Sequence, residues 1–185
     1  MRGQELAEHP TEVRLGIRLH RAIDAFTDGH PAFVSSRRRI EGSMRRFSGV
    51  LVDVFYDHFL LRRFAELTND ENPTVFAQGT YAMLRQHRAL LRGEIAVHLD
   101  RMIENRWLEK AQDLAGVRAV LRRITMRSKR GFELERGADE LERNYDAMAA
   151  DFDMFWPQVA SFARDRVQEL CADPALHCDV GLALP

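Results

Sequence analysis

Apolar residues recur three and four positions apart through nearly all of this 185-residue sequence, and no segment keeps the two-residue alternation of a half-buried strand. This periodicity predicts an all-α protein of about six to seven helices. Residues 1–171 are expected to form one compact helical domain and residues 172–185 a loosely ordered tail. The sequence contains no internal repeat and no linker long enough to divide the chain.

Gly, Pro, Ser and Thr residues mark the expected ends of the helices. The predicted helices cover residues 11–28, 32–46, 48–67, 74–92, 94–110, 113–129 and 137–170. Ser48 is expected to cap the third helix, which is the most apolar, and Pro157 is expected to kink or interrupt the last.

The composition excludes several classes of protein. The 27 Lys and Arg residues are balanced by 28 Asp and Glu, so the chain is not a polybasic nucleic-acid binder. No apolar run approaches the roughly 18 residues of a membrane span, and the first ten residues lack the apolar core of a secretory signal. We therefore expect a cytoplasmic protein in which Cys171 and Cys178 are reduced thiols. His177 beside Cys178 is too weak a pattern to predict a zinc site.

The first candidate site is a run of polar residues in the helix expected over residues 11–28. His20, Asp24 and Asp28 follow one another at i,i+4 spacing, which places neighbouring members on one helix face. An imidazole and a carboxylate at this spacing can ligate one divalent metal, or one can orient the other. The alternative is a solvated polar stripe near a helix end.

The second candidate site lies in the apolar helix expected over residues 48–67. Asp53 and Asp57 are again four residues apart, and His58 points about 100° further round the helix. Carboxylates in an apolar helix are costly unless a cation, an arginine or water compensates them. The alternative is that Asp53 caps or pairs with a neighbouring helix and His58 is a hydrogen-bonded core histidine. Two such clusters on neighbouring helices can face inward together.

Four ordered motifs resemble the acyl carrier protein phosphodiesterase family, namely HRAIDAFTDGHP, VDVFYDHFL, MIENRWLE and NYDAMAADFDMFWP. The similarity runs from about Val13 to Val167. The resemblance implies a relative of the HD-domain metallophosphohydrolases. It also implies Mn²⁺-dependent hydrolysis, with Mg²⁺ or Fe²⁺ as alternative metals, that removes 4′-phosphopantetheine from holo acyl carrier protein.

The resemblance also implies roles for particular residues. The expected metal ligands are His20, Asp24, Asp57 and His58, and the expected catalytic residues are Asp24, Asp57 and Arg21, the last holding the phosphoryl oxygens. Residues beside the metal or on the substrate side are expected to be Asp28, Asp53 and His30. Family members carry an earlier G-N-x-L-x-D-F-V-x-G-like motif with a further acidic residue of the metal site, and Met1-Arg2-Gly3 matches its end.

A cluster of arginines predicts the surface that meets the carrier protein. Five positive charges fall within ten residues, at Arg37, Arg38, Arg39, Arg45 and Arg46. Because carrier proteins of the fatty-acid type are acidic, this cluster would steer docking, although a solvated face is the plainer interpretation. No nucleic-acid or membrane partner is expected, and the oligomeric state stays open. The alternative functions are a phosphohydrolase of nucleotides or small phosphodiesters and a catalytically silent module that binds carrier protein.

Overall fold

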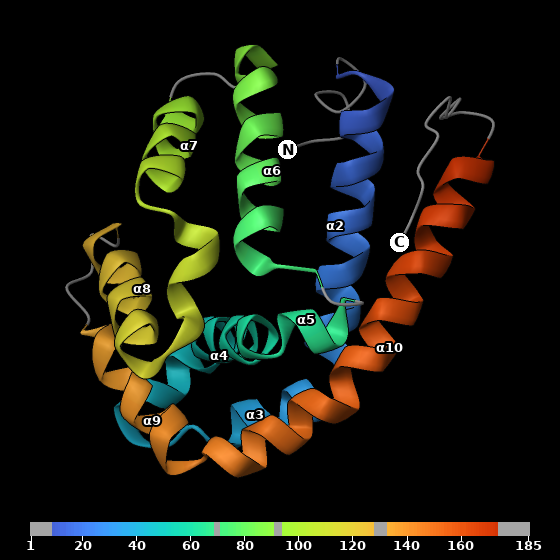
Figure 1. Ribbon diagram of the computed structural model, residues 1–185. Helices are drawn as coiled ribbons and strands as arrows, with labels where there is room; N and C mark the ends of the chain where they lie inside the picture. Colours follow the sequence, from blue (N-terminus) through green and yellow to red (C-terminus); the bar gives the residue numbers. More distant parts are fainter. Residues whose placement is uncertain (1–8, 69–70, 91–93, 128–132, 174–185) are drawn as a thin grey trace. The chain divides into compact units, whose positions relative to one another are not determined.

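The chain is mostly helical in the part that the computed structural model describes, which comprises residues 9–68, 71–90, 94–127 and 133–173 (Figure 1). These residues form nine α-helices and four 3₁₀ helices and contain no strand, which confirms the all-α prediction. The expectation for Met1-Arg2-Gly3, and that for Cys178 and the rest of the tail beyond Asp173, lie outside the described residues.

The nine α-helices outnumber the expected six to seven because the segments expected over residues 48–67 and 137–170 each form two α-helices, the latter being α9 (Ala138–Arg143) and α10 (Tyr145–Ala172). The segment expected over residues 32–46 is α3 (Pro31–Arg39) followed by the 3₁₀ helix η1 (Gly42–Phe47). Gly42, the first residue of η1, has a φ of 56°, a left-handed conformation that favours glycine. The segment expected over residues 48–67 is α4 (Ser48–Arg62) and α5 (Phe64–Leu67).

The chain divides into two compact units, and each is described by itself. Unit 1 comprises residues up to Ser36 and from Ala150 onward, and therefore contains α2 (Thr11–Gly29) and most of α10 (Tyr145–Ala172). Leu15 of α2 packs with Leu170 of α10, and the rings of Phe26 and Phe162 stack with their centroids 4.5 Å apart. Two apolar contacts, one toward each end of α2, thus hold the two helices together. The single-domain boundary at residue 171 stays a prediction.

Unit 2, from Arg37 to Ala149, is built around α4. Its other elements are α6 (Pro73–Gln86), η2 (Arg88–Leu90), α7 (Glu94–Glu104), η3 (Trp107–Gln112), α8 (Leu114–Arg127), η4 (Leu134–Gly137) and α9 (Ala138–Arg143). Helix α4 packs on η3 and α8, and α8 packs on η4 and α9. The buried core includes Leu51, Val52, Phe55, Phe59, Val117, Leu121, Leu141 and Met148.

Two glycines allow the elements of unit 2 to approach closely. A Cβ at Gly137 would collide with the side chain of Leu51, so η4 lies directly against α4. A Cβ at Gly116 would collide with the backbone carbonyl of Lys110, so the first turn of α8 lies directly against η3. The absence of a side chain at these positions therefore fixes how η3 and η4 frame the central helix.

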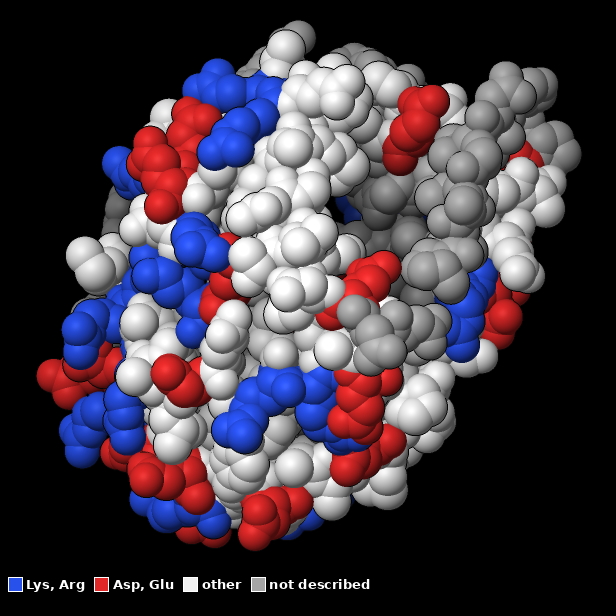
Figure 2. Space-filling view, viewed as in Figure 1, with Lys and Arg blue, Asp and Glu red and all other residues white. Residues whose placement is uncertain are grey.

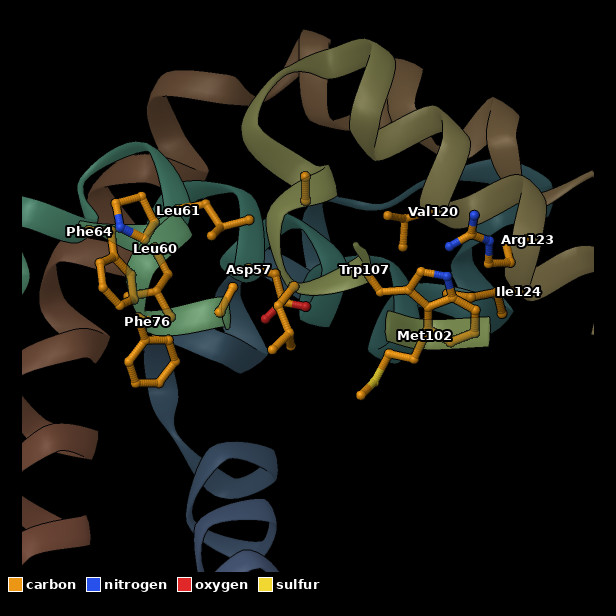
Figure 3. A pocket seen from close by; sticks show the side chains of 14 residues that line it. Asp57, Leu60, Leu61, Phe64, Phe76, Met102, Trp107, Val120, Arg123 and Ile124 are labelled. Carbon is orange, nitrogen blue, oxygen red and sulfur yellow. The ribbon is translucent and has the colours of Figure 1, made fainter. Parts of the chain in front are cut away.

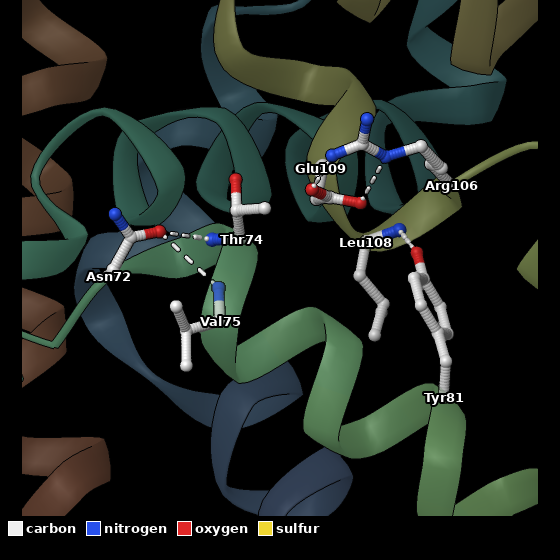
Figure 4. Close-up of polar contacts among 7 residues, drawn as sticks. All are labelled: Asn72, Thr74, Val75, Tyr81, Arg106, Leu108 and Glu109. Carbon is white, nitrogen blue, oxygen red and sulfur yellow. Dashed lines mark hydrogen bonds and ion pairs between the residues drawn. The ribbon is translucent and has the colours of Figure 1, made fainter.

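A side chain caps the start of α6 but not the start of α4. Asn72 caps α6, because its Oδ1 accepts hydrogen bonds from the backbone N–H groups of Thr74 at 2.9 Å and Val75 at 3.3 Å (Figure 4). The expectation that Ser48 caps α4 is wrong, since its hydroxyl accepts from Arg37 Nε at 3.5 Å instead. Helix α10 continues through Pro157 without a break. Among the described helices, none is long and apolar enough to cross a membrane.

Candidate functional site

The paired carboxylates of α4 mark a narrow accessible strip on a helix that is otherwise enclosed. From Leu51 to Phe59, all within the described residues, every side chain is buried except those of Asp53 and Asp57. A helix that is apolar nearly all round must be covered on most of its faces. The two carboxylates are therefore held one turn apart on a rigid support.

The environment of Asp57 changes its acidity. Surrounding protein limits the hydration of its carboxyl, and the charge of Asp53 adds repulsion, so the pKa of Asp57 rises to about 6. The side chain remains accessible to solvent because it lies in the wall of a pocket. A carboxyl group with a raised pKa in a concave site is the kind of group that binds a cation or exchanges a proton.

The pocket beside Asp57 has a volume of about 330 Å³ and is mostly apolar. Figure 3 shows Asp57 between two groups of side chains. Leu60, Leu61, Phe64 and Phe76 lie on one side, and Met102, Trp107, Val120, Arg123 and Ile124 lie on the other. Phe76 is half exposed and packs on Phe64, with 5.3 Å between ring centroids. An apolar pocket with few polar groups is the usual form of a small-molecule site.

His58, beside Asp57 in sequence, points into the core. Its Nδ1 lies 2.8 Å from the carbonyl oxygen of Ala111, and its Nε2 lies 3.0 Å from the Tyr145 hydroxyl. Because a carbonyl can only accept, Nδ1 carries the proton and Nε2 accepts from the hydroxyl of Tyr145. Burial lowers the pKa of His58 and favours this neutral form. The geometry thus favours the core-histidine interpretation, and metal ligation would require the loss of one of these contacts.

The wall formed by η3 is held by polar contacts (Figure 4). Arg106 has a φ of 50°, which is uncommon for a residue other than glycine, and its Nε donates to Oε2 of Glu109 at 2.9 Å. Hydrogen bonds from Arg106 and from Thr74 hold the pKa of Glu109 below its ordinary value. The backbone N–H of Leu108 donates to the Tyr81 hydroxyl at 2.9 Å. These contacts fix Trp107 and Leu108 as walls of the pocket.

The MIENRWLE segment therefore forms part of the pocket wall, a role that was not predicted from the sequence. Its Met102, Trp107 and Leu108 line the pocket, while Arg106 and Glu109 hold the backbone between α7 and η3. Trp107 and Arg123 were missed as candidate site residues. The signal for Trp107 was present, since a tryptophan in a polar stretch near a predicted helix end is unusual enough to mark a contact surface.

The first cluster lies in unit 1 and is far more exposed. His20 Nε2 lies 3.5 Å from Asp24 Oδ2, and the two side chains are 76% and 58% exposed. Arg21 and Asp28 are also exposed. The i,i+4 spacing thus brings His20 and Asp24 together as predicted, and both remain accessible to a ligand.

His30 differs from the rest of its motif because it is buried. Its Nδ1 accepts from the backbone N–H of Ala32 at 3.2 Å, and its ring packs on Phe26 and Phe155. Its Nε2 has no hydrogen-bond partner among the described residues. It lines a pocket of about 230 Å³ that also includes Asp151, whose Oδ2 accepts from Ser36 Oγ at 2.9 Å.

The two clusters belong to different units. The first lies in unit 1 and comprises His20, Arg21, Asp24, Asp28 and His30. The second lies in unit 2 and comprises Asp53, Asp57 and His58. Within each unit, as far as it is described, no three His, Cys, Asp or Glu side chains converge as a metal site. A joint metal centre of His20, Asp24, Asp57 and His58 therefore stays a prediction.

The arginine cluster is partly accessible. Arg38, Arg45 and Arg46 are exposed, whereas Arg37 and Arg39 are half-buried. Arg45 and Arg46 border a shallow hollow on η1, and the Arg46 guanidinium lies 4.7 Å from the centroid of the Phe47 ring. On the face shown in Figure 2, basic and acidic residues alternate over much of the surface, and a broad uncharged area covers α6.

Comparison with known proteins places these features in a family. The model of the acyl carrier protein phosphodiesterase family matches residues 1–159. The chain belongs to this family. Relatives named acyl carrier protein phosphodiesterase include the protein of Serratia proteamaculans, 28% identical over 166 residues, which are 90% of this chain and 86% of the relative.

Two further relatives of this phosphodiesterase family carry the same name. The protein of Klebsiella pneumoniae is 29% identical over 169 residues, 90% of this chain and 86% of the relative. The protein of Pectobacterium atrosepticum is 26% identical over 164 residues, which are 89% of this chain and 85% of the relative. No solved structure matches the chain significantly.

Proposed function

We propose that this chain hydrolyses the phosphodiester that joins 4′-phosphopantetheine to a serine of holo acyl carrier protein. The products are apo carrier protein and free 4′-phosphopantetheine. The match of the phosphodiesterase family model to residues 1–159 carries this proposal, and the shared name of relatives that align over most of their length supports it. An accessible carboxylate beside an apolar pocket suits a substrate whose scissile phosphate carries a long slender arm.

In this reaction water forms a new P–O bond, and the bond between phosphorus and the serine oxygen breaks. The serine oxygen leaves with a proton, so an acid or a cation must assist its departure. Asp57 faces the pocket and is the described carboxyl best placed to act at the reacting group. The charge of Asp53, one turn away, repels the ionised Asp57 carboxylate, and the two carboxylates together attract a cation more strongly than either would alone.

We propose that a divalent cation, Mn²⁺ with Mg²⁺ or Fe²⁺ as alternatives, binds at the paired carboxylates of α4. The donor set fits, because carboxylate oxygens suit these ions. A bound cation would also offset both causes that raise the pKa of Asp57, its limited hydration and its repulsion by Asp53. When bound, the cation supplies Lewis-acid chemistry and a nucleophilic water near neutral pH. His20 and Asp24 are the proposed further ligands, and Arg21 is the proposed contact to the phosphoryl oxygens.

We propose that the exposed arginines of α3 and η1 meet the acidic carrier protein. Arg38, Arg45 and Arg46 project positive charge from two consecutive elements, and such charge accelerates encounter and orients the partner. Arg37 has a different role, since its contact with Ser48 connects the end of α3 to the start of α4.

The function is tested by intact-mass spectrometry of holo acyl carrier protein incubated with the full chain and Mn²⁺, beside a sample containing EDTA. The proposal predicts that the carrier protein loses the mass of phosphopantetheine, and that EDTA prevents the loss. An unchanged holo mass with folded, metal-loaded protein would contradict the proposal. Hydrolysis of a small chromogenic phosphodiester by the same sample would then favour the alternative of a general phosphohydrolase.

A further inference from the structure

One end of the pocket beside Asp57 holds the side chain of Arg123. The guanidinium carbon of Arg123 lies 4.6 Å from the centroid of the Trp107 ring, and one Nη lies 3.4 Å from Oδ1 of Asn105. Among the described residues, no Asp or Glu forms an ion pair with Arg123. The preceding residue, Arg122, points elsewhere and pairs with Glu135, with 2.5 Å between Nε and Oε2. Two consecutive arginines of α8 therefore have different environments.

The surroundings of Arg123 favour a bound anion. The half-buried side chain of Arg123 shares the pocket wall with the apolar side chains of Met102, Val120 and Ile124. The contact with the indole ring leaves the edge of the guanidinium open, so that N–H groups other than the one facing Asn105 can donate in its plane. The planar fork of donors matches a phosphate or a carboxylate and can bind either in bidentate geometry.

We propose that Arg123 binds an oxyanion of the ligand that fills this pocket. This inference rests on the proposed function, in which the oxyanion is the phosphoryl group of the 4′-phosphopantetheine arm and the apolar walls contact the arm. Trp107 is a positioning residue, because it supports the guanidinium from the segment that Arg106, Glu109 and Tyr81 hold in place. The same chemistry would also accept the carboxylate of a free apolar chain.

The test compares two ligands that differ by the phosphate. Binding of 4′-phosphopantetheine and of pantetheine is measured by titration calorimetry in EDTA, with the intact wild-type chain and with Arg123→Gln. We expect the wild type to bind the phosphorylated ligand more tightly. Loss of a charge-assisted hydrogen-bond pair should weaken that binding about 10- to 100-fold in Arg123→Gln and leave pantetheine binding unchanged. Arg122→Gln, the matched control, should bind both ligands as the wild type does.

Further variants separate positioning from direct contact. Arg123→Lys keeps the charge without the fork and should retain part of the preference for the phosphorylated ligand. Trp107→Phe should retain most of that preference, whereas Trp107→Leu should reduce it. Equal affinity of Arg123→Gln and the wild type for 4′-phosphopantetheine would overturn the proposal, as would failure of the wild type to bind any ligand tested.

A third ligand, decanoate, distinguishes the source of the oxyanion. Binding of decanoate that depends on Arg123, without binding of 4′-phosphopantetheine, would support the oxyanion site and overturn its assignment to the phosphoryl group. Because the titrations contain no metal and no carrier protein, they do not depend on turnover. Binding of 4′-phosphopantetheine that depends on Arg123, in a chain that leaves holo carrier protein intact, would contradict the proposed function alone.

Discussion

The two histidine–aspartate clusters have similar sequence patterns and opposite environments. On α2 the spacing brings His20 beside Asp24, and the two side chains are 76% and 58% exposed. On α4 the carboxylates Asp53 and Asp57 are accessible, but His58 is 1% exposed and both of its ring nitrogens have partners. A histidine close to a carboxylate in sequence is thus a possible ligand in one cluster and a part of the core in the other.

The comparison shows that spacing identifies which side chains share a helix face, whereas the neighbouring elements decide what they can do. His58 lies about 100° round the helix from Asp57, which turns it toward η3 and the start of α10. Asp57 faces the pocket instead. The two residues, adjacent in sequence, therefore have separate environments, one in the wall of the pocket and the other in the core.

The largest expected effect is on turnover in Asp57→Asn. Removing the carboxylate that faces the pocket should lower the rate of holo carrier protein hydrolysis about 100- to 1,000-fold. The fold should persist, because the asparagine side chain has the same shape as that of aspartate. The substitution also removes the repulsion between residue 57 and Asp53. Intact-mass time courses measure the rate and circular dichroism checks the helices, with the exposed Asp146→Asn as control. Full activity in a folded Asp57→Asn chain would contradict the assigned site.

The next effect contrasts the two histidines by stability. His58→Ala leaves a cavity and removes partners from Ala111 and Tyr145, so it should lower the free energy of unfolding by about 2–4 kcal/mol. His20→Ala should change it by less than about 0.5 kcal/mol, because the side chain is exposed. Urea unfolding followed by circular dichroism measures both. Equal losses of unfolding free energy in His58→Ala and His20→Ala would contradict the inferred difference between the environments of the two histidines.

A smaller effect concerns pH. The pKa of Asp57 is about 6 in the folded chain and near 3.8 when unfolded, so the folded state holds its proton over that interval. Ionisation of the Asp57 carboxyl therefore lowers the free energy of unfolding as pH rises from about 4 to 6. The decrease is about 1–2 kcal/mol once solvent screening is allowed for. Asp57→Asn should be more stable than the wild type at pH 7 by that amount and equal to it at pH 4. A difference that does not vary with pH would contradict the raised pKa.

His58 should contribute a pH dependence of opposite sign. Its pKa is lowered in the folded chain, so the unfolded state gains a proton first as pH falls below the ordinary value of 6.5. The neutral ring then contributes fully to the free energy of unfolding above pH 6.5, and this contribution decreases as pH falls below 6.5. Unfolding of His58→Gln over the same pH range should lack this decrease. A decrease that persists unchanged in His58→Gln would assign it to another group.

The smallest expected effect concerns docking. Reversing the three exposed arginines, Arg38→Glu, Arg45→Glu and Arg46→Glu, should raise KM for holo carrier protein about 5- to 10-fold at low salt, with kcat nearly unchanged. The difference should shrink in high salt, where surface charges are screened. Arg164→Glu, an exposed arginine of α10, is the control. An unchanged KM at low salt would contradict the docking surface.

Much of the fold follows from local pattern, and the parts that do not are set by contacts between distant residues. The periodicity predicts every long helix, and the polar pair in an apolar helix predicts the accessible strip of α4. The state of His58 depends on partners 53 and 87 residues away, which no local spacing reveals. Arg122 and Arg123 are identical neighbours in the sequence, and only the packing of α8 decides that one pairs with Glu135 and the other faces the pocket.

The most direct test of the central claim is to run the reaction on holo carrier protein in water enriched in ¹⁸O and to weigh both products. Attack of water on phosphorus predicts that the released 4′-phosphopantetheine contains one ¹⁸O atom and that the apo carrier protein contains none. Appearance of ¹⁸O in the serine, or of a dehydrated serine, would show that the carbon–oxygen bond breaks instead. Either result would contradict hydrolysis of the phosphodiester at phosphorus.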